Sequence, residues 1–204
     1  MHLYYKPGAC SMAAHIILNE VGAKHTRESV DTEKGLTESG QDYSKVNPRG
    51  YVPALRLASG DVITENAAVL QYLGDQFPEH ALVPKAGTME RVRLQEILSF
   101  LSSELHRAFS PFFSGCEMSD EQKAAATAQL DRKIDQFEAM LSKTGPYILG
   151  DRLTVADLYA FVILNWTNFI DVPLSDRPVL VAFMKRIAVR KAVVQTLQEE
   201  GLAA

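Results

Sequence analysis

Residues 52–76, VPALRLASGDVITENAAVLQYLGDQ, place two β-prone runs and a helix in direct succession. The two runs, residues 54–57 and 62–64, flank the turn-forming residues ASGD and therefore predict a β-hairpin. Apolar residues then recur at helical spacing, which predicts a helix over residues 65–76. A hairpin that leads directly into a helix is typical of the second half of a small α/β unit.

The residues that precede this stretch supply the other half of the unit. Residues 2–5 form a short β-prone run that Pro7-Gly8 ends. A helix is expected from about residue 10 to residue 21, and residues 26–31 read as a second strand. The order is β-α-β followed by β-β-α, which predicts a mixed sheet with helices.

Strand signals nearly vanish after the proline- and glycine-punctuated stretch 81–87. Helices are expected at residues 88–113, 119–142, 178–190 and 192–200, with one more opened by the capping box Thr154-x-x-Asp157. Ser119-x-x-Gln122 is a second capping box. We therefore expect an α/β domain over residues 1–80, a linker over 81–87 and an all-helical domain over 88–204.

The composition is that of an ordinary globular protein. Of 204 residues, 47% are hydrophobic and 23% charged, which excludes a disordered tail, a collagen-like repeat and a disulfide-stapled miniprotein. A net charge of −4 gives no general reason to bind nucleic acid. There is no apolar run of membrane-spanning length and no signal-peptide pattern, and only two cysteines occur, so we expect a cytoplasmic protein without a membrane partner.

Cys10 is the first residue that could carry chemistry. It follows the turn at residues 7–9 and begins the expected helix, where free N–H groups and the helix dipole favour a thiolate. No second cysteine follows at Cys-x-x-Cys spacing, so a dithiol cycle within this motif is excluded. A nucleophilic cysteine that forms mixed disulfides and a small buried apolar residue both remain open. Cys116 has no such setting and is expected to be incidental.

Val52-Pro53 stands directly before the first strand of the hairpin, where proline is tolerated only as a strand start. A trans bond is the default. A cis bond would turn a backbone amide and carbonyl toward a neighbouring peptide and offer it a strand to pair with. The residues alone favour a trans proline at a strand start.

Glu65-Asn66 lies at the expected strand-to-helix junction. Backbone N–H groups at a helix start attract a carboxylate, and the Glu65 carboxylate can receive an ammonium group. The pair would therefore suit the head group of an α-amino acid. The alternative is that these side chains simply cap the helix.

A polar stripe follows on the next expected helix. Ser99, Ser103 and His106 stand at i, i+4 and i+7, so they share one face. His106 is the residue of this stripe that can exchange a proton near neutral pH. The alternative is a surface histidine or one whose hydrogen bonds are satisfied. No metal-ligand spacing, nucleotide loop or serine elbow occurs, so no metal is expected.

Five segments, taken in order, resemble the bacterial beta-class glutathione transferases from residue 1 to residue 201. They are YYKPGACS (4–11), VNPRGYVPAL (46–55), TENAAVLQYL (64–73), SELH (103–106) and GDRLTVAD (150–157). The resemblance implies a thioredoxin-like N-terminal domain, a helical C-terminal domain and a homodimer. It also implies glutathione as co-substrate, with no other cofactor.

The resemblance further implies the residues of the site. Cys10 would face the glutathione sulfur and His106 would close the site, as the two catalytic residues. The cysteinyl backbone of glutathione would pair with Val52 beside a cis Pro53, and its γ-glutamyl head would bind Glu65 and Asn66. Further glutathione contacts are expected at Tyr5, Ser11, Lys34, Gly35, Tyr51, Ser99, Ser103, Glu104 and Leu105. The hydrophobic substrate is expected near Phe109, Phe112, Phe113 and Trp166.

Two positions depart from the family pattern. The loop at residues 31–35 reads DTEKG, so Lys34 is expected to serve as the lysine that meets the glycyl end of glutathione. At position 99 the family usually has an asparagine that reaches the glutathione of the dimer partner. Ser99 is shorter and would reach it only through water.

The resemblance implies conjugation of glutathione to small hydrophobic electrophiles, as in detoxification. The glutathione thiol carries little thiolate at pH 7, so the helix start at Ser11, with Cys10 and His106, is expected to activate it. An apolar pocket discriminates poorly between similar small molecules, so the activity should be broad. Thiol transfer or dehalogenation through Cys10 is a competing activity. The alternative from another class is a non-catalytic glutathione-domain protein that binds a ligand or a partner protein.

Overall fold

The structure is a computed structural model that describes residues 1–202. Its contacts divide the chain into two compact units. The first comprises Met1–Val83 together with the segment from Ala188 onward, and the second comprises Pro84–Ile187. These units differ from the sequence-based domains in one respect, because the last helix packs with the N-terminal unit.

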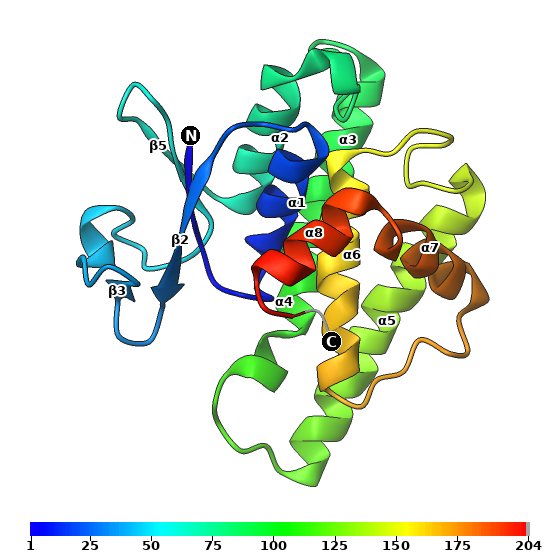
Figure 1. Ribbon diagram of the computed structural model, residues 1–204. Coiled ribbons are helices and arrows are strands. Elements are labelled where there is room, and N and C mark those ends of the chain that lie inside the picture. Colours follow the sequence, from blue (N-terminus) through cyan, green and yellow to red (C-terminus); the bar gives the residue numbers. More distant parts are fainter. Residues whose placement is uncertain (203–204) are drawn as a thin grey trace. The chain divides into compact units, whose positions relative to one another are not determined.

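A five-stranded mixed sheet forms the framework of the first unit (Figure 1). Its strands in sheet order are β3 (Leu36–Thr37), β2 (Thr26–Asp31), β1 (His2–Tyr5), β4 (Ala54–Arg56) and β5 (Val62–Thr64). Strand β1 runs parallel to β2, and every other pair is antiparallel. The expected hairpin is confirmed as β4–β5, with Leu55 opposite Ile63. Strand β3 was not expected, because two residues carry no readable alternation.

Three helices complete the first unit: α1 (Met12–Glu20), α2 (Asn66–Gln76) and α8 (Lys191–Glu199). Helix α1 packs against both α2 and α8 (Figure 1). It therefore buries every residue from Met12 to Leu18, including the polar side chain of His15. The expected helix starting near residue 10 begins two residues later, after Ser11.

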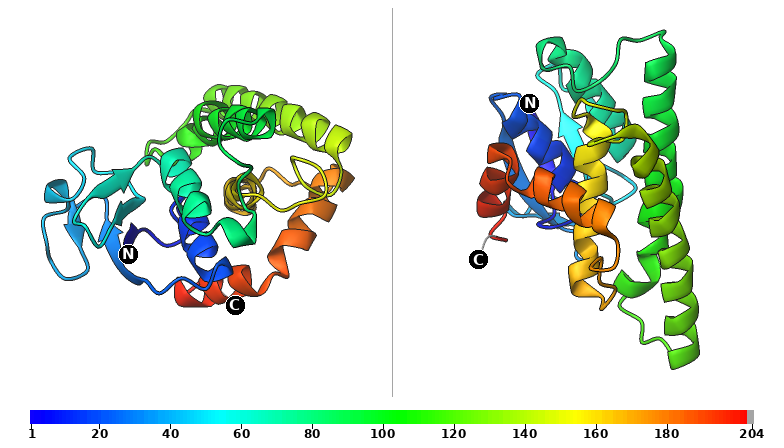
Figure 2. Two further views of the ribbon diagram at one scale, coloured as in Figure 1. Left: turned by 90° about the horizontal axis from the view of Figure 1, so that it is seen from above. Right: turned by 90° about the vertical axis from the view of Figure 1, so that its right-hand side faces the viewer.

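The second unit is helical, with no strand among its described residues. Its α-helices are α3 (Met89–Phe100), α4 (His106–Ala108), α5 (Asp120–Thr144), α6 (Val155–Asn165) and α7 (Pro178–Ala188). Helix α5 runs alongside the chain from α3 to α4 (Figure 2). Within residues 1–202, no helix is both long enough and apolar enough to span a membrane.

The single helix expected over residues 88–113 is wrong. Helix α3 passes into a π-helical turn at Leu101–Leu105, and after α4 the chain tightens into a 3₁₀ turn at Ser110–Phe113. Pro111 cannot donate a hydrogen bond to the preceding turn, which explains why the α-helix ends before it. The π turn carries no such signal in the sequence.

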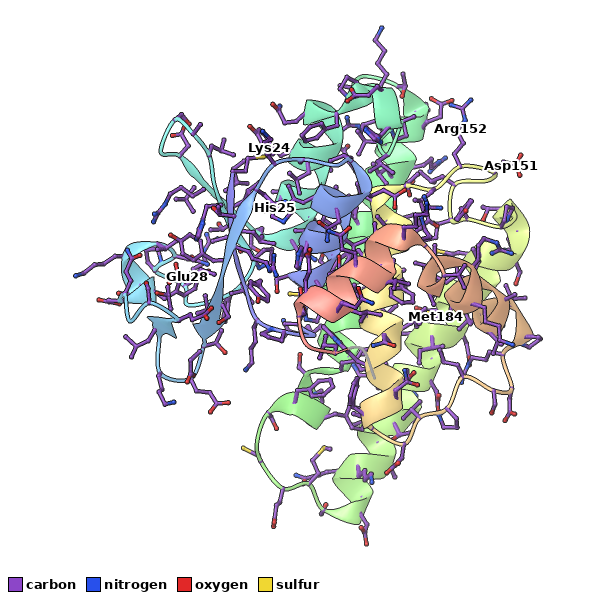
Figure 3. All side chains as sticks on the ribbon, viewed as in Figure 1. Lys24, His25, Glu28, Asp151, Arg152 and Met184 are labelled. Carbon is purple, nitrogen blue, oxygen red and sulfur yellow. The ribbon has the colours of Figure 1, made fainter. Side chains whose placement is uncertain are left out.

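Both expected capping boxes are confirmed. The Ser119 N–H donates to Gln122 Oε1 (2.9 Å), and the Gln122 N–H donates to Ser119 Oγ (3.2 Å). At α6 the Thr154 N–H donates to Asp157 Oδ2 (2.7 Å). The loop before α6 exposes Asp151 and Arg152 (Figure 3), whereas Thr154 and Asp157 are buried.

Candidate active site

The loop before α1 holds Cys10 in a fixed place. The Ala9 N–H donates to the Lys6 carbonyl (3.0 Å), which closes a turn over residues 6–9. Ser11 Oγ accepts from the Lys6 N–H (3.1 Å) and donates to the Lys6 carbonyl (3.3 Å). Because Ser11 is fully buried and its hydroxyl is already used twice, its side chain serves to hold this loop.

Three segments of the first unit meet at Cys10. The Cys10 thiol donates to the Val52 carbonyl, with Sγ and O 3.3 Å apart. The Val52-Pro53 bond is cis, as the family resemblance implied. Asn66, the first residue of α2, donates from Nδ2 to the Cys10 carbonyl (3.1 Å). The start of α1, the cis-proline loop and the start of α2 are therefore joined through one residue.

The expectation that Cys10 tends toward the thiolate is wrong for this structure. Burial raises the pKa of the Cys10 thiol to about 12, and the nearby Glu65 carboxylate adds to the rise. The backbone N–H groups of Cys10 and Ser11 act in the opposite direction, as a helix start should, but desolvation outweighs them. Cys10 is therefore a neutral hydrogen-bond donor at pH 7.

The cis-proline loop is held by two residues that the sequence did not single out. The Tyr43 hydroxyl and Asn47 Nδ2 both donate to the Tyr51 carbonyl, at 2.8 Å and 2.7 Å. Burial raises the pKa of Tyr43 to about 12, so its hydroxyl stays a donor. The Tyr51 side chain is 70% exposed, so the loop is fixed through its backbone while its ring stays accessible.

Glu65 and Asn66 stand at the start of α2, and the simple capping alternative is wrong for Glu65. Its side chain makes no capping hydrogen bond, and its backbone has a positive φ of 66°. The carboxylate instead pairs with Arg49, with Nη1 and Oε1 2.8 Å apart. Asn66 is 8% exposed, and its Oδ1 has no hydrogen-bond partner. An anionic side chain and a buried acceptor thus stand beside the free N–H groups of a helix start.

Lys34 and Gly35 lie on the exposed turn between β2 and β3. Lys34 pairs with Asp31 (2.9 Å between Nζ and Oδ2), and this contact lowers the pKa of Asp31 to about 2. Gly35 has a positive φ of 67°, which explains glycine at this position. A second cation, Lys6, reaches the same loop and donates to Thr32 Oγ1 (3.2 Å).

In the second unit, His106 sits in an aromatic cluster. Its Nδ1 lies 2.9 Å from the Tyr159 hydroxyl, and its ring centroid lies 4.8 Å from that of Trp166. Burial lowers the pKa of His106 below its usual 6.5, so the ring is neutral at pH 7. The roles in this hydrogen bond depend on the ring tautomer. When Nδ1–H donates to the Tyr159 hydroxyl oxygen, Nε2 carries the lone pair and can accept a proton. Tyr159 was not expected, because its helix reads as uniformly apolar core.

Trp166 is the centre of the aromatic residues expected near a hydrophobic substrate. Phe109 and Phe113 meet its ring edge to face, at centroid distances of 5.5 Å and 5.8 Å. Phe109 is fully buried, Phe112 is partly exposed and Phe113 is exposed. The cluster therefore offers apolar surface at Phe113 and Phe112 on a buried base.

The polar side chains of Ser103 and Glu104 are both in contact with other residues of this unit. Ser103 Oγ donates to the Ser99 carbonyl (2.8 Å), and the Glu104 carboxylate pairs with Lys133 (2.8 Å). Leu105 is fully buried. Ser103 and Glu104 lie in the π turn, and such turns occur frequently at functional sites. Among residues 1–202, no group of three or more His, Cys, Asp or Glu side chains could hold a metal ion.

Comparisons with known proteins agree on one family. The family model "Glutathione S-transferase, N-terminal domain" matches residues 8–76, and the model "Glutathione S-transferase, C-terminal domain" matches residues 94–191. Glutathione S-transferase GstA of Escherichia coli O157:H7 is 41% identical over 99% of this chain and 100% of its own length.

Solved structures point to the same family. The bacterial beta-class glutathione S-transferase of Sphingomonas chungbukensis is 43% identical, with a TM-score of 0.95 and full coverage of both chains. A sphingomonad glutathione S-transferase complexed with glutathione is 42% identical, with a TM-score of 0.94 and the same coverage. The chain therefore belongs to the glutathione S-transferase family, and within it to the bacterial beta class.

Proposed function

We propose that this transferase conjugates glutathione to small hydrophobic electrophiles, with its glutathione site in the unit that contains Cys10. The observation that carries the proposal is the meeting of Cys10, the cis Val52-Pro53 bond and Asn66. This arrangement offers an extended tripeptide a backbone to pair with at Val52 and a charged residue, Glu65, for its head group. The glutathione complex of the sphingomonad relative supports the choice of ligand.

The proposed chemistry is substitution or addition by the glutathione sulfur. Its thiol gives up a proton, and the sulfur then forms a bond to the electrophilic carbon. With an aryl halide, the carbon–halogen bond breaks and halide leaves with the bonding electrons. The first-turn N–H groups of α1 stabilise the thiolate, and we assign to the neutral His106 ring the role of accepting the thiol proton.

Cys10 has a different proposed role from activation of glutathione. Its thiol is neutral and its S–H is a weak donor already used on the Val52 carbonyl, so it adds little to a thiolate-stabilising field. A sulfur in this place can instead form a mixed disulfide with glutathione by exchange. The Cys10 thiol gives up its proton as its sulfur bonds to one sulfur of a glutathione disulfide, and the other glutathione leaves as a thiolate, which takes up a proton. Thiol transfer through Cys10 is therefore the second proposed activity, with a glutathione disulfide or another mixed disulfide as the oxidised co-reactant.

Two matched variants separate these activities. Cys10→Ser keeps a donor to the Val52 carbonyl, and Cys10→Ala removes it. We expect both variants to conjugate glutathione to a model aryl halide within about threefold of the parent, because α1 still provides its N–H groups. Thiol transfer should fall about a hundredfold or more in both. Loss of conjugation in both variants would make Cys10 the activator and overturn this division of roles.

The proposal as a whole is tested by calorimetric titration with glutathione together with turnover of the aryl halide. Binding at millimolar concentrations or below, with glutathione-dependent turnover, is expected. Binding without turnover in any glutathione-dependent assay would favour a non-catalytic binding protein. Absence of glutathione binding by the reduced protein would exclude both the transferase and the non-catalytic glutathione-binding protein.

We also propose that the enzyme is a cytoplasmic homodimer. Helix α3 exposes the apolar side chains of Met89 and Val92, at 60% and 41%; they stand three residues apart and so share one face, which we propose as the dimer contact. Light scattering after gel filtration should give twice the chain mass, and Met89→Asp should shift it toward the single-chain mass. A parent protein of single-chain mass would refute the dimer, and cell fractionation would test the location.

A further inference from the structure

Arg49 and Glu65 form an exposed ion pair at the proposed head-group end of the glutathione site. Arg49 Nη1 lies 2.8 Å from Glu65 Oε1, and the two side chains are 62% and 65% exposed. A pair as exposed as this contributes little to stability, because water and salt screen it. Its two charges are therefore accessible to a ligand and can exchange partners at small cost to the fold.

The backbone beneath Arg49 is firmly held, although its side chain is exposed. Asn47 Oδ1 accepts from the Arg49 N–H (3.2 Å), and the Gly50 N–H donates to the Asn47 carbonyl (2.9 Å). Asn47 itself is buried and also bonds the Tyr51 carbonyl. The same turn that fixes the cis-proline loop thus fixes the backbone from which the Arg49 side chain extends.

The Glu65 side of the pair is fixed in a similar way. Glu65 has a positive φ and its carbonyl accepts from the N–H groups of Ala68 and Val69, which begin the ladder of α2. Its side chain does not cap that helix. An unfavourable backbone conformation in a non-glycine residue persists only where its surroundings require it, and such residues cluster at ligand sites.

The two charges together match a zwitterion. An α-amino acid head group carries one ammonium and one carboxylate, whereas Glu65 alone would attract the first and repel the second. A guanidinium at 2.8 Å balances the Glu65 charge and adds planar donors that suit a carboxylate. Asn66, directly beside Glu65, contributes a buried Oδ1 without a partner and belongs to the same cluster.

We propose that Arg49 binds the α-carboxylate of the γ-glutamyl group while Glu65 binds its ammonium, so that the ion pair selects a zwitterionic head group. This inference rests on the proposed glutathione site. It makes Arg49 a determinant of specificity for the co-substrate. It also predicts that the contact between Arg49 and Glu65 is at least partly replaced by contacts to the ligand.

Calorimetric titration with three peptides tests the assignment. The peptides are glutathione, its analogue 4-aminobutanoyl-Cys-Gly, which lacks the α-carboxylate, and glutaryl-Cys-Gly, which lacks the ammonium. Arg49→Ala should raise the Kd for glutathione about tenfold, the loss typical of a charge-assisted hydrogen bond, and change the Kd for 4-aminobutanoyl-Cys-Gly less than twofold. Glu65→Gln should raise the Kd for glutathione in the same way, but it should change the Kd for glutaryl-Cys-Gly, which lacks the ammonium, less than twofold.

Two further variants serve as controls. Arg49→Lys keeps the charge but loses the planar fork, so its Kd for glutathione should lie between those of the parent and Arg49→Ala. Lys24→Ala removes an exposed cation of the same unit that lies just before β2 (Figure 3), and should leave all three Kd values unchanged. The thermal midpoint of Arg49→Ala should match that of the parent.

The outcomes separate this inference from the proposed function. If the parent binds glutathione but Arg49→Ala weakens glutathione and 4-aminobutanoyl-Cys-Gly equally, or weakens neither, the assignment to Arg49 is refuted and the glutathione site stands. If Lys24→Ala weakens glutathione binding as much as Arg49→Ala does, then positive charge anywhere on the unit strengthens binding without direct contact, and the assignment to Arg49 again fails. If the parent binds none of the three peptides, the proposed function itself fails and this inference with it.

Discussion

Replacement of Glu200 by alanine should destabilise the N-terminal unit strongly. Glu200 follows α8 and is buried, with Oε1 2.9 Å from His15 Nδ1 and Oε2 accepting from the Gly8 N–H (2.9 Å). Glu199 bonds the other ring nitrogen of His15 (2.8 Å). The carboxylate of Glu200 therefore connects the C-terminal segment, the centre of α1 and the loop that leads to Cys10.

The size of the effect follows from what Glu200→Ala leaves behind. The buried Nδ1 of His15 loses its partner, and an orphaned buried polar group of this kind costs about 1–3 kcal/mol. Removal of one partner from a buried charged contact typically costs about 3–5 kcal/mol. We therefore expect a loss of about 4 kcal/mol. Glu200→Gln keeps an acceptor oxygen and should cost about half as much.

Urea unfolding at pH 7.5, followed by far-ultraviolet circular dichroism, measures this loss. Glu117→Ala, a change of an exposed carboxylate in the loop before α5, should stay within about 0.5 kcal/mol of the parent. Thiol transfer by Glu200→Ala should also fall at temperatures where the variant is folded, because Gly8 lies two residues before Cys10. A loss below about 1 kcal/mol would refute the argument that this carboxylate holds the unit together.

Three further changes are predicted. Burial lowers the pKa of His106, so its stabilising contribution is present above pH 6.5 and is lost as the pH falls through the lowered value. His106→Asn should therefore flatten the dependence of unfolding free energy on pH just below 6.5, and it should lower kcat about tenfold or more. Asp157→Ala leaves the Ile148 N–H and two donors of Thr154 without their acceptor, so urea unfolding should show a decrease of about 3 kcal/mol or more in the free energy of unfolding. A decrease of less than about 1 kcal/mol would contradict the capping role. Tyr43→Phe should lower the free energy of unfolding by only about 1 kcal/mol, because Asn47 still donates to the Tyr51 carbonyl. A thermal midpoint equal to that of the parent would show that the hydroxyl is dispensable.

The sequence predicted those elements whose signals are local. The hairpin β4–β5 and helix α2 follow from a turn flanked by two β-prone runs and from helical spacing, and both capping boxes are read from four residues each. The cis Val52-Pro53 bond came from the family resemblance, since the residues alone favour trans.

The features that the sequence missed depend on contacts between distant residues. Helix α8 reads as one more amphipathic helix, and its contacts with α1 assign it to the N-terminal unit. These contacts include the fit of Glu199 and Glu200 around His15 and the hydrogen bond from Asn19 to Thr196. The pKa of Cys10 was misjudged because a helix start is visible in the sequence, whereas the desolvation that outweighs it is not. The pairing of Arg49 with Glu65 is likewise set by two turns sixteen residues apart.

The acidity of glutathione on the enzyme tests the central claim most directly. Thiolate absorbance near 240 nm is titrated with the double variant Cys10→Ala/Cys116→Ser, so that only the ligand contributes a thiol, and the signal of free glutathione is subtracted to give the pKa of the bound peptide. If the first unit binds glutathione and stabilises its sulfur as an anion, the midpoint should fall at least one pH unit below that of free glutathione, for which a thiol pKa of about 8.5 is the reference. A midpoint equal to that of free glutathione, at a peptide concentration that saturates the protein, would contradict the claim.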